Sequence, residues 1–191
     1  GGGSVMDAAK VLRFQPDGHD WLSRHLDVSI EDQTLLKMPL LLASTTAGTG
    51  SEVTPTATIW DFVKQRKHSF FGPQVLANVA IIDPHLCLGA PWLISRDAAI
   101  DALSHALEAI WNRNRTAETT NHAIFAANKI CHYLPLLRDQ LDSLEFRKEL
   151  SEAALLAGLA MAKTQTALAH ALSYAETVAS QKSHGQSLSL I

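Results

Sequence analysis

An aspartate and a histidine, Asp101 and His105, stand four residues apart in a segment otherwise rich in alanine and leucine. In a helix this spacing puts both side chains on one face, where both can reach a single metal ion. Charge buried among apolar neighbours is costly unless it is paired or bound to a metal. The pattern predicts a metal site or a plain hydrogen bond between the two side chains; a pair that faces solvent is the third alternative.

Two further histidines complete a candidate ligand set. His170 lies in a similar alanine- and leucine-rich context, and His184 follows 14 residues later, where we expect a loop. One carboxylate and three imidazoles, with no thiolate, suit Fe²⁺ or Zn²⁺, and Mn²⁺, Co²⁺ or Ni²⁺ are alternatives. Taken alone, a histidine in this context is more often a hydrogen-bonded histidine of an apolar core.

A glycine-rich loop opens the chain. Residues 1–4 read Gly-Gly-Gly-Ser and lead into a segment with helical spacing that carries Asp7 and Lys10. A glycine turn lets backbone N–H groups approach an anion, and a helix N-terminus adds about half a positive charge. These features favour a pyrophosphate site, although the pattern is neither GxGxxG nor a Walker A motif. A flexible turn or a cloning scar is the alternative.

A second polar loop, residues 45–52, is rich in threonine, serine and glycine and follows an apolar run at residues 39–44. Ligands of α/β folds bind beyond the carboxyl ends of parallel strands, which is where such a loop would lie. A cluster of helix-capping hydroxyls, with Glu52 in the capping role, explains the pattern equally well.

The elements around these residues divide the chain in two. Residues 1–92 hold eight of the ten glycines, a helical pattern at 3–14 and short apolar runs typical of strands at 39–44, 56–60 and 79–82. This alternation predicts α/β packing around a parallel sheet.

Residues 93–191 predict an all-α domain, with helices at 95–111, 117–137, 144–162 and 164–174. Ser95, with Asp97 after it, marks the expected start of the first helix, and Pro135 should interrupt or end the second.

Composition excludes several classes of protein. The chain has 191 residues, 47% of them hydrophobic and 18% charged, with a formal net charge of −3. This balance predicts a globular protein with no nucleic-acid partner and no attraction to an anionic membrane. No apolar run or basic leader predicts a membrane span or a secretory signal. Two isolated cysteines, Cys87 and Cys131, cannot form a disulfide framework, which favours a reduced, cytoplasmic protein.

Several segments together resemble the iron-containing, group III alcohol dehydrogenases. They are GGGSVMDAAK (1–10), TTAGTGSEVTPTATIWD (45–61), VAIIDP (79–84), DALSHALEAIW (101–111) and ALAH (167–170) followed by His184. Within the family, residues 60–70 and 163–177 are most similar to the phosphonoacetaldehyde-reductase-like branch. The resemblance covers nearly the whole chain, with the segments in the family's order.

The resemblance implies a dehydroquinate synthase-like architecture, with the active site between a dinucleotide-binding domain and a helical metal domain. The implied metal ligands, for Fe²⁺ or Zn²⁺, are Asp101, His105, His170 and His184. The implied contacts to NAD or NADP are Gly2, Gly3, Ser4, Asp7, Thr45, Thr46, Thr49, Ser51, Thr54 and Lys67. Many relatives carry a histidine where this chain has Tyr174, which departs from the family's proton relay; Tyr174 is the candidate catalytic residue, as a phenol that hydrogen-bonds the substrate or the ribose.

Against the family, the chain is about half the usual length, and it begins with glycine. It therefore looks like an internal fragment, with an incomplete α/β domain at 1–92 and a truncated α-helical domain at 93–191. The residue that distinguishes NAD from NADP would precede this sequence. Apolar surface left uncovered by missing helices favours a homo-oligomer or aggregation.

The implied reaction is hydride transfer between the nicotinamide and a small primary alcohol or aldehyde. If the substrate is phosphonoacetaldehyde, Lys163 is a candidate for its anionic end, although a solvated lysine is the simpler interpretation. Two other functions stay open: a truncated, inactive remnant that binds metal only, and a glycerol-dehydrogenase-like enzyme.

Overall fold

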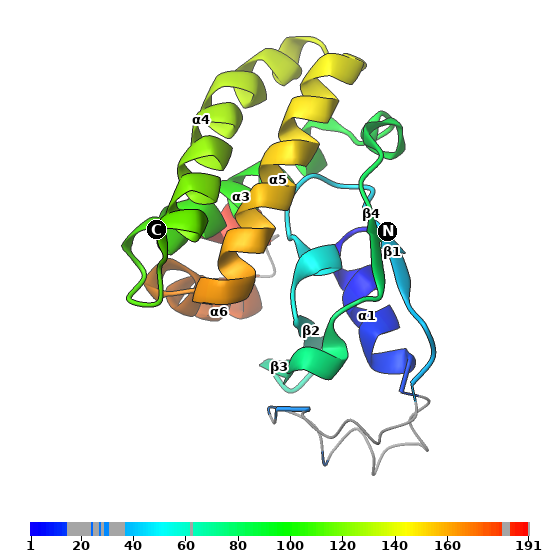
Figure 1. Ribbon diagram of the computed structural model, residues 1–191. Helices are drawn as coiled ribbons and strands as arrows, with labels where there is room; N and C mark the ends of the chain where they lie inside the picture. Colours follow the sequence, from blue (N-terminus) through cyan, green and yellow to red (C-terminus); the bar gives the residue numbers. More distant parts are fainter. Residues whose placement is uncertain are drawn as a thin grey trace.

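The structure is a computed structural model, and it describes residues 1–14, 24, 27, 29–30, 37–61, 63–180 and 184–190. Figure 1 shows a mixed α/β portion, which contains the N-terminus, packed beside a larger group of helices. The expected division of the chain at residues 92 and 93 into two domains remains a prediction.

A short parallel strand pair forms the sheet that the sequence predicts. Strand β1 (Leu41–Ala43) pairs with β4 (Val79–Ile81), and Leu41 lies opposite Val79 in the register. Helix α1 (Gly3–Leu12) begins within the glycine loop. Three 3₁₀ turns connect these elements: η1 (Ser51–Val53), η2 (Pro73–Val75) and η3 (Pro84–Cys87).

The strand expected near residues 56–60 belongs to an antiparallel hairpin instead of the parallel sheet. β2 (Thr56–Asp61) pairs along its whole length with β3 (Arg66–Phe71), which the sequence analysis did not predict. Ala57 and Phe70 are paired in the register and are both buried, in one apolar cluster with Val11 of α1. The hairpin is therefore held by one buried face that packs towards α1.

Lys10 ties α1 to this hairpin. Its side chain is fully buried, and Nζ donates hydrogen bonds to the carbonyl oxygens of Thr54 at 2.8 Å and Thr56 at 2.7 Å. Burial disfavours the charged amine and lowers the pKa of Lys10 to about 8. The residues that follow η1 and the second polar loop, Thr54 and Thr56, are thereby fixed to α1.

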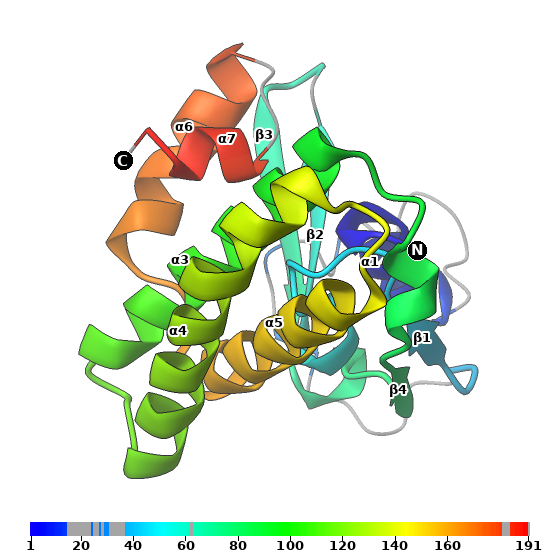
Figure 2. The same cartoon turned by 90° about the horizontal axis from the view of Figure 1, so that it is seen from above.

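The second portion consists of helices that pack through small side chains. It contains α3 (Trp92–Trp111), α4 (Ala117–Asp139), α5 (Leu144–Thr164), α6 (Leu168–Ser180) and α7 (His184–Leu188). Viewed from above, α3, α4 and α5 lie together, and α6 and α7 lie beside them near β3 (Figure 2). Alanines of α3, α4 and α5 form most of the buried core, which lets the helix axes approach closely.

Several helix boundaries differ from those expected. α3 begins at Trp92, and Ser95 lies inside it, where Ser95 Oγ donates to the carbonyl oxygen of Ala90 and accepts from Arg147. α4 continues through Pro135 to Asp139. α6 begins at Leu168 and extends to Ser180, beyond the expected end at 174. No helix among the described residues combines the length and the apolar character that a membrane span needs.

Candidate metal and cofactor site

One face of α3 carries three buried polar side chains, Asp101, His105 and Glu108. Their spacing of four and three residues lines them up along the helix. The opposite face, represented by Ala102 and Ala106, packs into the core with α4 and α5. The small residues of α3 let this helix pack closely against α4 and α5, and this packing holds its polar residues in place.

Helices α6 and α7 supply the two remaining histidines. His170 lies in the first turn of α6 and is 2% exposed. His184 is the first residue of the short helix α7, whereas the sequence analysis expected a loop. Gly185 lets α7 approach α3, because a Cβ atom there would lie 2.1 Å from the carbonyl oxygen of Asp97.

The four predicted ligands converge on one oxygen atom. Nε2 of His170, His105 and His184 lies 3.4, 3.5 and 3.7 Å, respectively, from Oδ1 of Asp101. Ligand atoms of Asp101, His170 and His184 all lie within 4.8 Å of one another. The rings of His105 and His170 are stacked, with centroids 4.6 Å apart. Asp101, His170 and His184 thus form one cage, and His105 lies beside it, with its Nε2 atom next to Asp101 Oδ1.

The cage fits a divalent metal ion. Ligand atoms placed about 2.1 Å from a tetrahedral ion lie about 3.4 Å from one another, close to the distances from Asp101 Oδ1 to the three Nε2 atoms. Asp101 Oδ1 and His170 Nε2 are buried and have no hydrogen-bond partner. Unpaired buried polar atoms are costly, and a cation at the centre of the cage would satisfy both. The donor set of one carboxylate and three imidazoles suits Fe²⁺ or Zn²⁺.

The protonation states favour cation binding. Burial disfavours the imidazolium form and lowers the pKa of His105 to about 4, and burial also lowers the pKa of His184. Burial alone would lower the pKa of His170 too, but the nearby carboxylates of Asp101 and Glu108 raise it. For Asp101, the nearby histidines outweigh burial and lower the pKa. The carboxylate and two of the imidazoles therefore already have their metal-binding protonation states at neutral pH.

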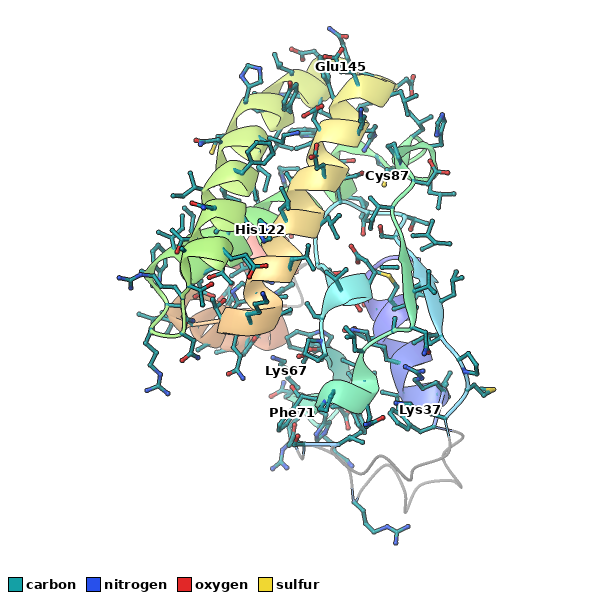
Figure 3. All side chains as sticks on the ribbon, in the orientation of Figure 1. Lys37, Lys67, Phe71, Cys87, His122 and Glu145 are labelled. Atoms are coloured by element: carbon teal, nitrogen blue, oxygen red, sulfur yellow. The ribbon has the colours of Figure 1, made fainter. Side chains whose placement is uncertain are left out.

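An aromatic and basic wall stands beside the cage. The ring of Tyr174 stacks on His184, with centroids 5.7 Å apart, and Lys67 Nζ lies 3.5 Å from the centroid of the Tyr174 ring. The ring centroid of Trp60, on β2, lies 6.1 Å from the ring centroids of both Tyr174 and His184. Figure 3 shows Lys67 between the hairpin and the helical portion. The hairpin thus brings a cation next to the metal cage.

The two predicted cofactor loops lie against each other. Thr45 N donates to the carbonyl oxygen of Gly1, and a Cβ atom on Gly3 would lie 2.6 Å from Thr49 Cγ2. Thr46 lies next to Gly2. Ser4 is exposed at the start of α1. Two segments that are 40 residues apart in the sequence therefore form one surface at the positive end of a helix.

Several of the predicted cofactor residues bind other protein groups, among them Thr49, whose Oγ1 accepts a hydrogen bond from Ser51 N at 3.2 Å. Asp7 accepts hydrogen bonds from Ser51 Oγ at 2.6 Å and from Thr58 N at 2.9 Å. Thr54 is buried and lies within 3.4 Å of Lys10 Nζ through its hydroxyl oxygen. These contacts hold the two loops and the hairpin together, which favours an indirect role for Asp7, Ser51 and Thr54.

Sequence reasoning missed two residues of this site, Glu108 and Trp60. The helical spacing of Glu108 from Asp101 was the available signal for the first, and Trp60 lies in the segments 45–61 and 60–70, which carry the resemblance but gave it no role. Lys163, the candidate for an anionic substrate group, instead lies on the surface, with its ammonium 2.7 Å from Glu118. This position agrees with the simpler interpretation of a solvated lysine.

Solved structures share this fold. A sulfoacetaldehyde reductase from Bifidobacterium kashiwanohense, solved in complex with NAD⁺, is 29% identical and superposes with a TM-score of 0.89, covering 99% of this chain and 50% of that one. An iron-containing alcohol dehydrogenase from Thermotoga maritima is 30% identical, with a TM-score of 0.85 and coverage of 98% and 50%.

Family models match both portions of the chain. Residues 1–84 match the model described as iron-containing alcohol dehydrogenase, and residues 96–191 match the model of the family's C-terminal region. The chain therefore belongs to the iron-containing alcohol dehydrogenase family.

Two curated relatives show how much of the family's length is present. A probable alcohol dehydrogenase, EutG, of Salmonella typhimurium is 34% identical over 100% of this chain and 48% of its own length. The phosphonoacetaldehyde reductase of Streptomyces viridochromogenes is 33% identical over 97% of this chain and 48% of its own. The chain spans about half the length of the curated relatives it matches.

Proposed function

We propose that this chain carries the metal site and part of the cofactor site of an NAD- or NADP-dependent alcohol dehydrogenase or aldehyde reductase. The observation that supports this most directly is the gathering of three imidazole nitrogens around one buried, unpaired oxygen of Asp101. Family membership supports the reaction class, since the relatives include alcohol dehydrogenases and aldehyde reductases.

In this proposal, Asp101, His105, His170 and His184 hold Fe²⁺ or Zn²⁺. When bound, the ion polarises the oxygen of the alcohol or aldehyde, and the nicotinamide accepts or donates the hydride. α3, α6 and α7 keep the four ligands rigid, so that little rearrangement opposes binding. The burial of Asp101 and His105 excludes water from the floor of the site.

The glycine loop and the threonine loop are proposed to hold the dinucleotide. Backbone N–H groups of Gly2, Gly3 and Ser4, at the positive end of α1, would bind the pyrophosphate. Thr45, Thr46 and Thr49, in the loop that lies against the glycines, would add contacts to the cofactor, while Asp7, Ser51 and Thr54 keep the loops in place. Lys67 would contact the cofactor or the substrate from the hairpin, and Tyr174 would donate a hydrogen bond or a proton beside His184.

Metal loading tests the ligand assignment. We expect the chain to bind one equivalent of Zn²⁺ or Fe²⁺ per molecule, and the variants His170→Ala and His184→Ala to bind much less. Metal content after dialysis, measured by mass spectrometry, gives the stoichiometry. His122→Ala, on the surface of α4, is the matched control. Unchanged metal content in both site variants would show that the ligand assignment is wrong.

A titration with NADH separates an enzyme from a metal-binding remnant. If the two loops form a working cofactor site, NADH fluorescence should change on addition of the chain, and more strongly once the chain holds metal. Binding of metal without binding of NADH would instead favour the inactive remnant. Oxidation of glycerol in preference to primary alcohols would favour the glycerol-dehydrogenase-like alternative.

The substrate is proposed to be a short aldehyde with an anionic group. Two relatives are named for such aldehydes, phosphonoacetaldehyde and sulfoacetaldehyde. Lys67 lies beside the cage and can face an anion there. We expect kcat/KM for phosphonoacetaldehyde to exceed that for propionaldehyde by about tenfold or more. This is the effect expected of one charge-assisted hydrogen bond. Comparable values for the two aldehydes would remove the reason to propose an anionic substrate.

A further inference from the structure

Glu108 is a buried carboxylate that no part of the proposed reaction uses. It lies on α3, one turn beyond His105, and is 1% exposed. A carboxylate in such a position is costly unless several donors surround it. The groups that surround the Glu108 carboxylate therefore indicate its role.

Every hydrogen bond recorded for Glu108 comes from the start of α6. Oε2 accepts from Ala167 N at 2.8 Å, and Oε1 accepts from Ala169 N at 2.6 Å and His170 N at 3.3 Å. These are backbone N–H groups that a helix cannot satisfy within its own first turn. Glu108 thus caps α6 from a different helix, and its negative charge faces the positive end of the α6 dipole.

The same carboxylate also reaches the side chain of a proposed metal ligand. Oε2 of Glu108 lies 2.7 Å from Nδ1 of His170. A carboxylate that already accepts three backbone N–H bonds has no proton to give, so Nδ1 of His170 must carry the hydrogen. In the neutral ring, the other nitrogen, Nε2, then has a free lone pair, and Nε2 is the atom that faces Asp101 in the cage.

We infer that Glu108 is a positioning residue of the metal site, which fixes the tautomer and the orientation of His170 while it caps α6. The inference rests on the proposed metal function of the cage. One side chain on α3 thereby sets the direction of a ligand on α6 in two ways, through the backbone and through the ring. Outer partners of this kind typically change metal affinity by about 10- to 100-fold when they are altered.

The variant Glu108→Gln tests this inference with almost no change in shape. The amide has one acceptor oxygen, so if that oxygen keeps the bonds to the backbone, the NH₂ group faces His170 Nδ1. That arrangement favours the opposite tautomer, in which Nε2 carries the hydrogen and points it into the cage. We expect Glu108→Gln to bind Co²⁺ or Zn²⁺ about 10- to 100-fold more weakly than the unmodified chain.

Ser173→Ala is the matched control, because Ser173 is buried in the same helix and its hydroxyl donates to the carbonyl oxygen of His170. It removes a hydrogen bond from α6 and leaves Glu108 in place. Thermal unfolding of the metal-free chains shows how far each variant is destabilised. The inference would be overturned if Glu108→Gln bound metal within twofold of the affinity of the unmodified chain. It would also be overturned if Ser173→Ala lost as much metal affinity as Glu108→Gln.

A second measurement needs no substitution. Long-range ¹H–¹⁵N NMR spectra of the unmodified, metal-free chain, recorded where His170 is neutral, report which ring nitrogen carries the hydrogen. We expect the hydrogen on Nδ1, and finding it on Nε2 would overturn the inference. Failure of the unmodified chain to bind metal would instead contradict the proposed function, while the tautomer would still decide the role of Glu108.

Discussion

At the scale of single residues, the cage is built from groups that differ in how tightly they hold a proton. Burial lowers the pKa of His105 to about 4, so this imidazole is neutral near pH 6, and burial also lowers the pKa of His184. The nearby carboxylates of Asp101 and Glu108 raise the pKa of His170 against the effect of burial. Of the three imidazoles, His170 is therefore the one at which a proton competes most strongly with the metal ion.

This difference predicts the pH dependence of metal binding. A metal ion must displace the proton on His170, so its apparent affinity should fall by about tenfold for each pH unit below the pKa of His170. The slope of the logarithm of affinity against pH should be near one just below the pKa of His170, and it should steepen at lower pH, where His184 and, towards pH 4, His105 also gain protons. Competition titrations with a Zn²⁺ indicator between pH 5.5 and 8 measure this slope. A slope near three over that range would contradict the assignment.

Much of the site could be predicted from its residue types. Asp101 and His105 are marked by their helical spacing, and His170 and His184 by the family resemblance. Glu108 was harder to predict because a glutamate in a helix is ordinary, and only the fold shows that α6 begins at its carboxylate. Trp60 could not be predicted, since its role depends on a hairpin whose second strand has no strong strand pattern.

At the scale of elements, the site depends on how closely α7 approaches α3. Gly185 makes this approach possible, since a Cβ atom there would lie 2.1 Å from the carbonyl oxygen of Asp97 and 2.6 Å from its carbonyl carbon. Both atoms belong to the backbone inside α3, which cannot move aside as a flexible side chain can. α7 would have to shift instead, and His184 would shift with it.

We therefore expect Gly185→Ala to weaken metal binding by about tenfold or more and to lower the free energy of unfolding by about 1–3 kcal/mol. Urea denaturation and a Co²⁺ titration measure the two effects. Gly89→Ala is the control, because a Cβ atom there meets nothing within 4 Å. Metal affinity in Gly185→Ala equal to that of the unmodified chain would show that the close packing of α7 is not needed for the site.

Element boundaries were predicted less well than element types, for physical reasons. Pro135 was expected to break a helix, but α4 continues through it, because tertiary packing of the helix outweighs the lost hydrogen bond. β3 was missed because its sequence, RKHSFF, has little apolar alternation, and its stability comes from pairing with β2 and from buried Phe70. The parallel pairing of β1 and β4 was predicted because both are short apolar runs.

At the scale of the whole molecule, the parallel strand pair leaves apolar surface uncovered. Leu41 is 57% exposed, Val79 47% and Ile81 39%, while Leu42, between Leu41 and Ala43, is buried. In the register, Leu41 lies beside Val79, and Ala43 lies beside Ile81, so these exposed side chains share one face of the pair. Exposed apolar faces of this kind promote association between molecules.

We expect this chain to self-associate through that face in a concentration-dependent way. The double variant Val79→Lys and Ile81→Lys should weaken association, because each apolar side chain that becomes buried contributes about 1 kcal/mol or more and a buried lysine opposes burial. Two such contributions correspond to a dissociation constant raised by at least tenfold. Sedimentation velocity at several concentrations measures the change. Val63→Lys is the control, since Val63 is 94% exposed and lies in the hairpin turn, away from the strand pair. If Val63→Lys weakened association as much as the double variant, the added charge alone would account for the effect, and the face of β1 and β4 would not be the contact.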